Sequence, residues 1–397
     1  MSKSDVLYGV QNKYSEATDG GISGKGRIAP LTSLRFFAAF FVVFYHLQGV
    51  VIPMPSINQM ALGVSFFFVL SGFILSTVYP DATKMSLSKF YASRLARLWP
   101  VHALCVFAVV FAYDRAMLFD GFWLPKVLTN LSMLHAWIPQ YGYVFSLNSV
   151  SWSISAEFGF YLLFPVLAAS RQVGKVVILI GILTAIGLFL LEFNHATVWS
   201  EDPWRFSAVL LVSQSPFARL FEFAVGVWAA RVFRERRYSG FVTKHANVLE
   251  VGAILLLLAF GVVSRYVVAA VLGRGFHIFG SWLDVAGGVL VFAFMIFVFA
   301  HSAGALSRGL SNRVLVFLGE ASFALYMVHQ LIIKYAMTKG WTTLLPWPLT
   351  LLLLCLVIGI TSVAVYVLWE RPMRRLLLQT HAVLSSRMRA IRQVVTS

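Results

Sequence analysis

The sequence contains few charged residues and few cysteines. Asp, Glu, Lys and Arg make up only 12% of its 397 residues, whereas 59% of the residues are hydrophobic. A soluble domain carries about 25% charged residues, so the composition excludes an ordinary soluble protein. The two cysteines, Cys105 and Cys355, lie in apolar runs without paired spacing, which supports neither a disulfide framework nor a zinc site. We expect no bound metal, because no His, Cys or carboxylate cluster has ligand spacing.

A cleavable signal sequence is also missing. The first 29 residues are polar and rich in Gly and Ser, and the first apolar run is long enough to span a bilayer. We predict that residues 1–29 form a flexible cytoplasmic tail. Residues 30–375 then form the transmembrane domain, and residues 376–397 form a basic cytoplasmic tail.

Long apolar stretches dominate the rest of the chain. Ten of them approach the length of about 20 residues that a transmembrane helix requires. We therefore predict an all-α, polytopic membrane protein with about ten transmembrane helices. The predicted spans are 34–52, 60–79, 98–113, 148–169, 175–192, 208–230, 248–272, 282–300, 314–335 and 348–369.

Lys and Arg are distributed unevenly between alternate connections. If the N-terminus is cytoplasmic, most of them fall on the cytoplasmic side, and this asymmetry places both termini there. The opposite connections carry only a few, namely Arg115, Lys126, Arg205, Arg274 and Lys339. We assign the net charge of +16 to topology and to contact with anionic membrane lipids. No nucleic-acid motif accompanies it, so we expect no nucleic-acid partner.

Arg35 and His46 lie inside the first apolar stretch, where an ionisable side chain is costly. Eleven residues apart, they share one helix face and lie about 16 Å apart along the axis. We expect Arg35 near a membrane surface and His46 near mid-depth. An imidazole can take a proton from an attacking hydroxyl or carry an acyl group. The structural alternative is a buried His that donates to a neighbouring carbonyl.

Arg94 and Arg97 lie three residues apart in the segment Ser93-Arg94-Leu95-Ala96-Arg97. The spacing puts two guanidinium groups on one face of a short helix beside the membrane. Paired guanidinium groups suit phosphate capture. Anchoring of the helix by positive charge on the cytoplasmic side is the alternative.

Five segments occur in the order expected of the acyltransferase-3 family. They are Arg35 with ten intervening residues and His46, then segments 64–75, 94–97, 151–157 and 322–329. Over residues 30–375 the chain resembles these integral-membrane O-acyltransferases. The family modifies bacterial surface polysaccharides, lipopolysaccharide O-antigen, Nod factors and some secondary metabolites. The chain looks like the stand-alone form without a C-terminal esterase-like domain.

The resemblance implies transfer of an acyl group, with acetyl expected, from cytoplasmic acyl-CoA to a hydroxyl of a surface polysaccharide, lipopolysaccharide or lipid-linked sugar. It places the protein in the bacterial inner membrane. Arg94 and Arg97 would hold the phosphates of coenzyme A, and Arg35 would lie between that entry and His46. His46 would activate the acceptor or relay the acyl group. Direct transfer and an acyl-histidine intermediate both stay open.

Glu157 is a carboxylate within the fourth predicted span, where it needs a partner or a proton. Counting 1.5 Å per residue from the span ends puts His46, Glu157 and His329 in one layer. Glu157 then orients or charge-stabilises His46, as a carboxylate does in other acyl-transfer sites. The alternative is a structural pair with Arg219 or Arg35.

Ser322, Tyr326 and His329 form a polar stripe on one helix face, which must meet protein or water. We expect the stripe to line the acceptor route, and helix association is the alternative. Trp152 and Ser153 add a ring and a hydroxyl for contact with a sugar, although Trp152 also suits an interfacial belt.

Three further features bear on structure and topology. Arg219 and Glu222 have the spacing of a pair within one helix, and Ser71-Gly72 permits close helix packing or a helix break. Loops 114–147 and 193–207 are predicted to form an acceptor vestibule on the outer side.

Two rival functions remain. A transporter of acyl donors or lipid-linked sugars predicts an inverted repeat, and the halves show none. The second is an acyltransferase that acts on a small hydrophobic metabolite from the cytoplasmic side.

Overall fold

The computed structural model describes residues 28–54, 57–113, 122–200 and 202–395. The predicted N-terminal tail falls almost entirely outside these residues, as does Arg115. Within them every regular element is a helix, apart from two isolated bridges. Ten helical segments of the described chain are long and apolar enough to cross a membrane. The prediction of an all-α polytopic membrane protein is confirmed.

The N-terminal half contributes helices α2 to α9, which are separated by short connections. Their bounds are α2 Ala29–Leu47, α3 Gly63–Val78, α4 Leu87–Ala108, α5 Trp123–Leu131, α6 Tyr141–Val144, α7 Trp152–Ala169, α8 Val173–Phe193 and α9 Ala208–Gln214.

The C-terminal half contributes helices α10 to α18. Their bounds are α10 Pro216–Arg234, α11 Ser239–Lys244, α12 Ala246–Gly273, α13 His277–Ala286, α14 Val289–Ala300, α15 Ala305–Leu310, α16 Arg313–Thr338, α17 Trp347–Val365 and α18 Arg371–Val395.

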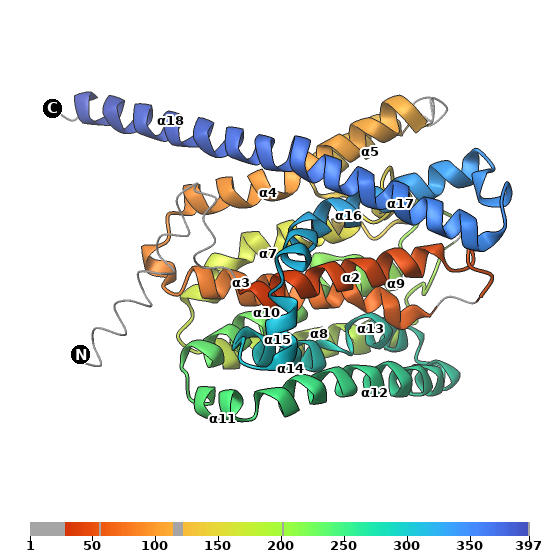
Figure 1. Ribbon diagram of the computed structural model, residues 1–397, viewed down its shortest axis with the longest axis horizontal. Coiled ribbons are helices and arrows are strands. Elements are labelled where there is room, and N and C mark those ends of the chain that lie inside the picture. The colour runs from red at the N-terminus through yellow and green to blue at the C-terminus, as the bar shows by residue number, and fades with distance from the viewer. Residues whose placement is uncertain (1–27, 55–56, 114–121, 201, 396–397) are drawn as a thin grey trace.

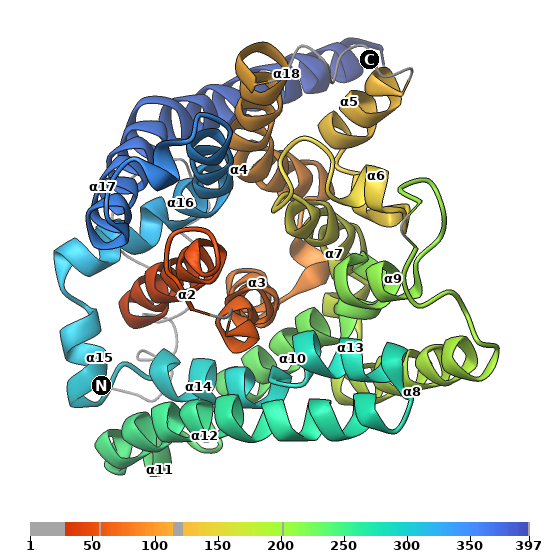
Figure 2. The same cartoon turned by 90° about the vertical axis from the view of Figure 1, so that its right-hand side faces the viewer.

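Helices α2 and α3 lie in the middle of the bundle, and the other long helices surround them (Figure 2). Helix α3 crosses α10 at unusually close range, because a Cβ on Gly72 would collide with the backbone carbonyl of Phe223. A Cβ on Gly226 would likewise collide with the carbonyl of Val69. Of the two interpretations of Ser71-Gly72, close packing is therefore confirmed, since α3 continues unbroken through both residues.

Helix α4 begins eleven residues before the predicted start of its span, at Leu87 instead of residue 98. Ser86 precedes it as an N-cap, and its side chain accepts a hydrogen bond from the backbone N–H of Lys89. The prediction of a short helix for Arg94 and Arg97 is wrong, because α4 is 22 residues long. A count of apolar residues stops at the basic side chains, whereas the helix runs through them.

Two predicted spans are each divided into two helices. The sixth is divided at Ser215, where α9 ends and Pro216 opens α10, because proline lacks the N–H that would continue the first helix. The eighth is divided at Gly287 and Gly288, between α13 and α14.

Helix α18 occupies most of the segment that we predicted as a C-terminal tail. It continues from α17 through a π-helical turn at Tyr366–Glu370 and extends to Val395. In Figure 1 it runs beside α4 and past the end of the bundle. The Ser88 hydroxyl and His381 Nε2 lie 2.8 Å apart where the two helices meet.

Two buried or half-buried carboxylates satisfy the free N–H groups of helix starts far away in sequence. Glu192 accepts from the backbone N–H groups of Ile278 at 2.8 Å and Phe279 at 2.9 Å, at the start of α13. Glu250 accepts from Gly304 at 2.9 Å and Leu306 at 3.0 Å, at the start of α15. These bonds hold the peripheral helices against the bundle.

Candidate active site

His46 and His329 contact each other across the α2–α16 interface. His46 lies at the end of α2 and His329 lies in α16, and Nδ1 of His46 is 3.2 Å from Nε2 of His329. Their ring centroids are 5.0 Å apart. His329 is fully buried and His46 is half-buried. The pair brings together two residues that we had predicted as separate site members.

The neighbours of the two rings determine where their protons lie. His329 Nδ1 is 2.7 Å from the carbonyl oxygen of Tyr326, which can only accept, so this nitrogen carries the hydrogen. In the neutral ring, Nε2 of His329 is then an acceptor. Nδ1 of His46 faces that acceptor and the Val42 carbonyl oxygen, 2.9 Å away, and so it also carries a hydrogen.

Nε2 of His46 therefore keeps its lone pair in the neutral ring. Among the described residues it has no hydrogen-bond partner. The arrangement leaves one basic nitrogen available in a buried setting, as an acyl-transfer base requires.

His46 lies one residue before α2 ends at Leu47, whereas the predicted span continued to residue 52. The chain turns after Leu47, and Gly49 adopts a positive φ of 73°, a conformation that suits glycine. The apolar run continues to Ile52 through this turn, which is why the sequence placed the span too far along the chain.

Glu157 does not hydrogen-bond to His46. Its carboxylate accepts hydrogen bonds from the Ser71 hydroxyl, at 2.8 Å, and from the Tyr161 hydroxyl. Of the structural alternatives, a pair with Arg219 is wrong. Tyr161 lies four residues after Glu157 on the same helix, so spacing alone would have identified this partner.

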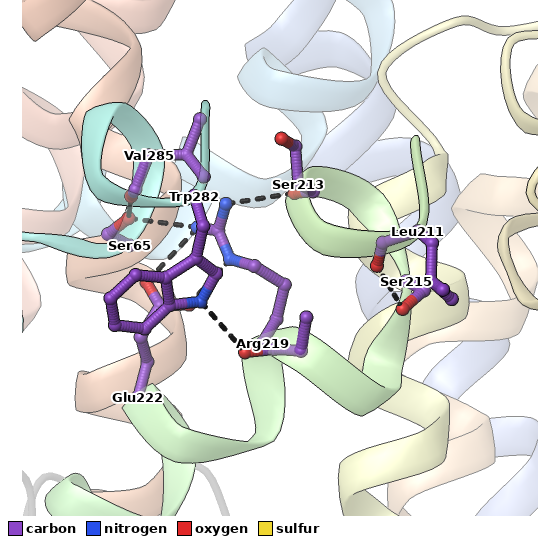
Figure 3. A network of polar contacts seen from close by, with 9 residues as sticks. Ser65, Leu211, Ser213, Ser215, Arg219, Glu222, Trp282 and Val285 are labelled. Atoms are coloured by element: carbon purple, nitrogen blue, oxygen red, sulfur yellow. Dashed lines mark hydrogen bonds and ion pairs between the residues drawn. The ribbon is translucent and has the colours of Figure 1, made fainter. Parts of the chain in front are cut away.

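Arg219 pairs with Glu222 instead, as their spacing predicts. Both are buried, and Arg219 Nε and Nη2 donate to the two carboxylate oxygens. Arg219 also donates to the Ser213 carbonyl and the Ser65 hydroxyl, each at 2.9 Å. Figure 3 shows this network at the α9–α10 break, facing α3. Full pairing explains how the bundle tolerates the charges.

Trp152 packs inside the bundle. The Arg219 guanidinium carbon lies 5.7 Å from the centroid of its ring, and the ring of Phe68 meets it edge-on at 6.1 Å. The ring of Trp152 therefore contacts protein side chains on one side.

The polar stripe of α16 faces protein, as predicted. The Tyr326 hydroxyl donates to the Val150 carbonyl at 2.9 Å and accepts from the Ser153 hydroxyl at 2.8 Å. The Ser322 hydroxyl donates to the Gly319 carbonyl. All three side chains are buried, and the stripe joins α16 to the start of α7.

A cluster of charges lies toward the other end of α2. Arg97, Glu370, Glu157 and Tyr161 lie within electrostatic range of Arg35. Within the described residues, Arg35 and Arg97 make no hydrogen bond or ion pair. The Arg94 guanidinium carbon lies 5.9 Å from the centroid of the Tyr161 ring.

Glu370 is the member of this cluster that we did not predict. It is buried, and its Oε2 has no hydrogen-bond partner among the described atoms. The sequence feature that could have identified Glu370 is its position just beyond the last predicted span, beside Arg371.

The two loops that we predicted to form the vestibule pack against each other. The Gly142 N–H donates to the Pro203 carbonyl at 2.8 Å, and the Ser207 N–H donates to the Pro139 carbonyl at 2.9 Å. Aromatic rings line the contact, and those of Phe122 and Trp204 lie 4.5 Å apart.

A second buried polar cluster was missed. His102 in α4 stacks on His135 at 5.8 Å, and His135 Nε2 lies 3.2 Å from the Ser151 hydroxyl. Asn130 and Asn148 are buried beside them. His102 and His135 are far apart in the sequence and share no helical period, so no local pattern predicted that they would be in contact.

The described residues contain no group of three or more His, Cys, Asp or Glu side chains arranged to hold a metal ion. Both cysteines are free.

Comparison with known proteins gives a match to the sequence model of the acyltransferase-3 family, described as an acyltransferase domain, over residues 29–369. The chain is similar to acyltransferase MdmB of Streptomyces mycarofaciens, with 28% identity over 88% of this chain and 92% of that protein. It is also similar to the exopolysaccharide production protein ExoZ of Rhizobium meliloti, with 27% identity over 79% of this chain and 90% of that protein.

The peptidoglycan O-acetyltransferase OatA of Listeria monocytogenes is 26% identical over 77% of this chain. The match covers 49% of that protein, so the chain spans about half of its length. No solved structure matches.

Proposed function

The chain belongs to the acyltransferase-3 family and is a multi-pass membrane O-acyltransferase; on that premise, we propose that it transfers an acetyl group from acetyl-CoA to a hydroxyl of a surface polysaccharide, lipopolysaccharide or lipid-linked sugar. The donor enters from the cytoplasm and the acceptor from the outer side of a bacterial inner membrane. Both termini are cytoplasmic in this arrangement.

The observation that carries the proposal is the free Nε2 of His46. The Val42 carbonyl and His329 both face Nδ1 of the same ring, and this leaves the opposite nitrogen to act on substrate. His329 orients the ring and fixes its tautomer, in the way that a second residue positions the catalytic imidazole in other acyl-transfer sites.

The arginine cluster supports a donor site at the cytoplasmic end. Arg94 and Arg97 supply guanidinium groups for the phosphates of coenzyme A. Arg35 acts next along the path, since it lies on the face of α2 that leads to His46, about 16 Å farther along the axis. An extended thioester arm, held at its phosphates by Arg94 and Arg97, would pass Arg35 and present its carbonyl to His46.

Glu157 balances the charge of Arg35, which lies within its electrostatic reach. Ser71 and Tyr161 hold the carboxylate in place. In this proposal Glu157 acts on the reaction through its charge and not through a hydrogen bond to His46.

Two reaction routes are consistent with this geometry. In direct transfer, His46 Nε2 removes the hydroxyl proton of the acceptor, the oxygen bonds to the thioester carbonyl carbon, and the carbon–sulfur bond breaks. The proton passes from His46 to the departing thiolate.

In the relay route, Nε2 itself attacks the thioester carbonyl, and the thiolate leaves. Nε2 then carries the acyl group, and Nδ1 can pass its proton to Nε2 of His329. The acceptor oxygen then displaces the imidazole, His329 returns the proton to Nδ1 of His46, and the proton of the acceptor hydroxyl neutralises the thiolate.

The acceptor side is supported by the aromatic contact between the outer loops and by the polar stripe of α16. Trp152, Ser153, Ser322, Tyr326 and His329 are the proposed contacts for the sugar route. A relative named for exopolysaccharide production and one named a peptidoglycan O-acetyltransferase both favour a glycan acceptor.

Mass spectrometry of surface glycans tests the function. Cells that express the wild-type protein should carry O-acetyl esters that are absent both from cells without the gene and from cells with the His46→Ala variant. Identical glycans in all three strains would overturn a glycan acceptor.

A further inference from the structure

An apolar groove runs along helix α8 on the lipid-facing side of the bundle. It has a volume of about 560 Å³ and lies between α8, α10, α13 and α14. Every residue that lines it is apolar, aromatic or glycine. Helix α8 packs loosely here, since Ile178 is 62% exposed and Ile182 is 51% exposed.

Two glycines of α8, Gly174 and Gly181, line the groove, and Gly181 lets α8 approach Phe221 of α10 closely. The groove extends along α8 from Gly174 past Gly181 to Leu188, which is about 21 Å at 1.5 Å per residue. A Cβ added to Gly181 would lie 3.0 Å from Cε2 of Phe221. The groove is therefore long, narrow and parallel to the membrane-spanning helices, a shape that fits a single hydrocarbon chain within a core about 30 Å thick.

Positive charge gathers at one end of this groove. Arg171 and Lys175 flank Gly174 at the start of α8, and their side chains are exposed. Neither makes a hydrogen bond or ion pair among the described residues. Arg231 in α10 lies at the same end, where it donates to the Ser170 carbonyl at 2.9 Å.

A tryptophan marks the boundary between the apolar groove and the charged end. Trp228 lines the groove, and its Nε1 would lie 3.6 Å from a Cβ on Gly174. The indole N–H has no hydrogen-bond partner among the described residues. Tryptophan at this level typically places its ring in the apolar layer and its N–H among lipid headgroups.

We propose that this groove binds one acyl chain of an anionic phospholipid, whose phosphate lies between Arg171, Lys175 and the Trp228 indole. The apolar walls select a hydrocarbon chain, and the cations at the mouth select a negative headgroup. The bound chain fills the groove beside α8 and so completes the packing of this helix.

The groove is separate from the proposed donor path. Figure 2 shows α8 and α4, which carries Arg94 and Arg97, on different sides of the central helices α2 and α3. Phospholipid binding is therefore independent of acyl transfer, and either proposal can fail without the other.

Native mass spectrometry of the purified full-length protein tests the site. The protein is delipidated in mild detergent and then titrated with phosphatidylglycerol or with phosphatidylcholine. Each cation near an anionic headgroup contributes about a fivefold preference, so we expect phosphatidylglycerol to bind about 25-fold more tightly. The wild-type melting temperature should rise with phosphatidylglycerol and not with phosphatidylcholine.

Two glycine variants separate the groove from the rest of α8. Gly181→Leu fills the groove and should abolish phosphatidylglycerol binding. Gly187→Leu is the matched control, because a Cβ at Gly187 meets nothing within 4 Å, and it should bind as the wild type does.

The double variant Arg171→Gln/Lys175→Gln changes only exposed side chains and leaves the groove intact. It should bind both lipids equally, and this readout holds even if Gly181→Leu fails to fold. Equal binding of the two lipids by the wild type, or unchanged phosphatidylglycerol binding in folded Gly181→Leu, would overturn the proposal. A polyprenyl phosphate retained in place of phospholipid would also overturn it.

Discussion

Nε2 of His329 lies 3.2 Å from Nδ1 of His46, although 283 residues separate them in the chain. The Tyr326 carbonyl accepts from the other nitrogen of His329, so the pair has a defined order of donors and acceptors. This order leaves Nε2 of His46 as the free base, and the first two predictions below depend on it.

Replacement of His46 by alanine should abolish acyl transfer and leave the protein folded in the membrane. The change removes a neutral ring and leaves no unpaired charge, so we expect only a small loss of folding stability. Loss of a general base alone lowers the rate about 10²- to 10⁴-fold. Acyl transfer is measured with purified protein in liposomes. Substantial activity in a well-expressed His46→Ala variant would exclude both proposed roles for His46.

Replacement of His329 by glutamine should lower kcat and leave the affinity for acyl-CoA unchanged, because His329 orients His46 and does not hold the donor. We expect a loss of at least about tenfold. His301→Gln is the matched control, since His301 lies at the end of α14 and is half-buried. A His329→Gln variant that loses donor affinity and keeps kcat would contradict the positioning role.

Replacement of both Arg94 and Arg97 by glutamine should weaken acetyl-CoA binding about 10²- to 10⁴-fold, since each charge-assisted bond contributes about 1.5 to 3 kcal/mol. Isothermal calorimetry on purified protein measures the change. Arg236→Gln/Arg237→Gln removes two exposed charges of the same kind and should bind as the wild type does. If both double variants bind acetyl-CoA with equal affinity, Arg94 and Arg97 do not bind its phosphates and serve only to anchor the helix by positive charge.

Stability should fall when the pH drops below about 6.5, partly because of His135. Burial, together with the nearby His102 ring, lowers the pKa of His135 to about 3. Between about pH 6.5 and 3 the unfolded chain therefore binds a proton that the native protein does not, which lowers the free energy of unfolding by up to about 1.4 kcal/mol per pH unit. Above about pH 6.5 this contribution to stability is fully present.

Melting temperatures in detergent between pH 8 and pH 4 measure this effect. His135→Gln should show a shallower decrease than the wild type, whereas His277→Gln, at an exposed position, should show the same decrease. An unchanged slope in His135→Gln would mean that the native protein binds the proton at His135.

The transmembrane orientation is tested by cysteine labelling on a background with Cys105→Ala and Cys355→Ala. Thr197→Cys in the loop 193–207 should react with an impermeant thiol reagent in intact cells. Lys84→Cys, close to the start of α4, should react only after the cells are opened. Both positions are exposed, and the reverse pattern would defeat the proposed route from an inner donor to an outer acceptor.

The sequence predicted the parts of this protein that depend on neighbours along the chain. Apolar length identified ten spans because a bilayer demands about 20 apolar residues in a row, and helical spacing correctly paired Arg219 with Glu222. Helix ends were less accurate. Ser86 starts α4 through a side-chain cap, and Gly49 lies in the turn that follows α2, whereas a count of apolar residues registers neither signal.

Contacts between helices were decided only by the tertiary structure. The sequence placed His46, Glu157 and His329 at one level, but it did not specify that the two imidazoles touch, or that Glu157 binds Ser71 and Tyr161. Such contacts depend on how helices distant in sequence rotate and cross, and these angles are set by close approaches such as that of Gly72 to the α10 backbone. Local composition and periodicity thus determined which residues lie in the membrane and on which helix face. Packing among the helices determined which of those faces meet.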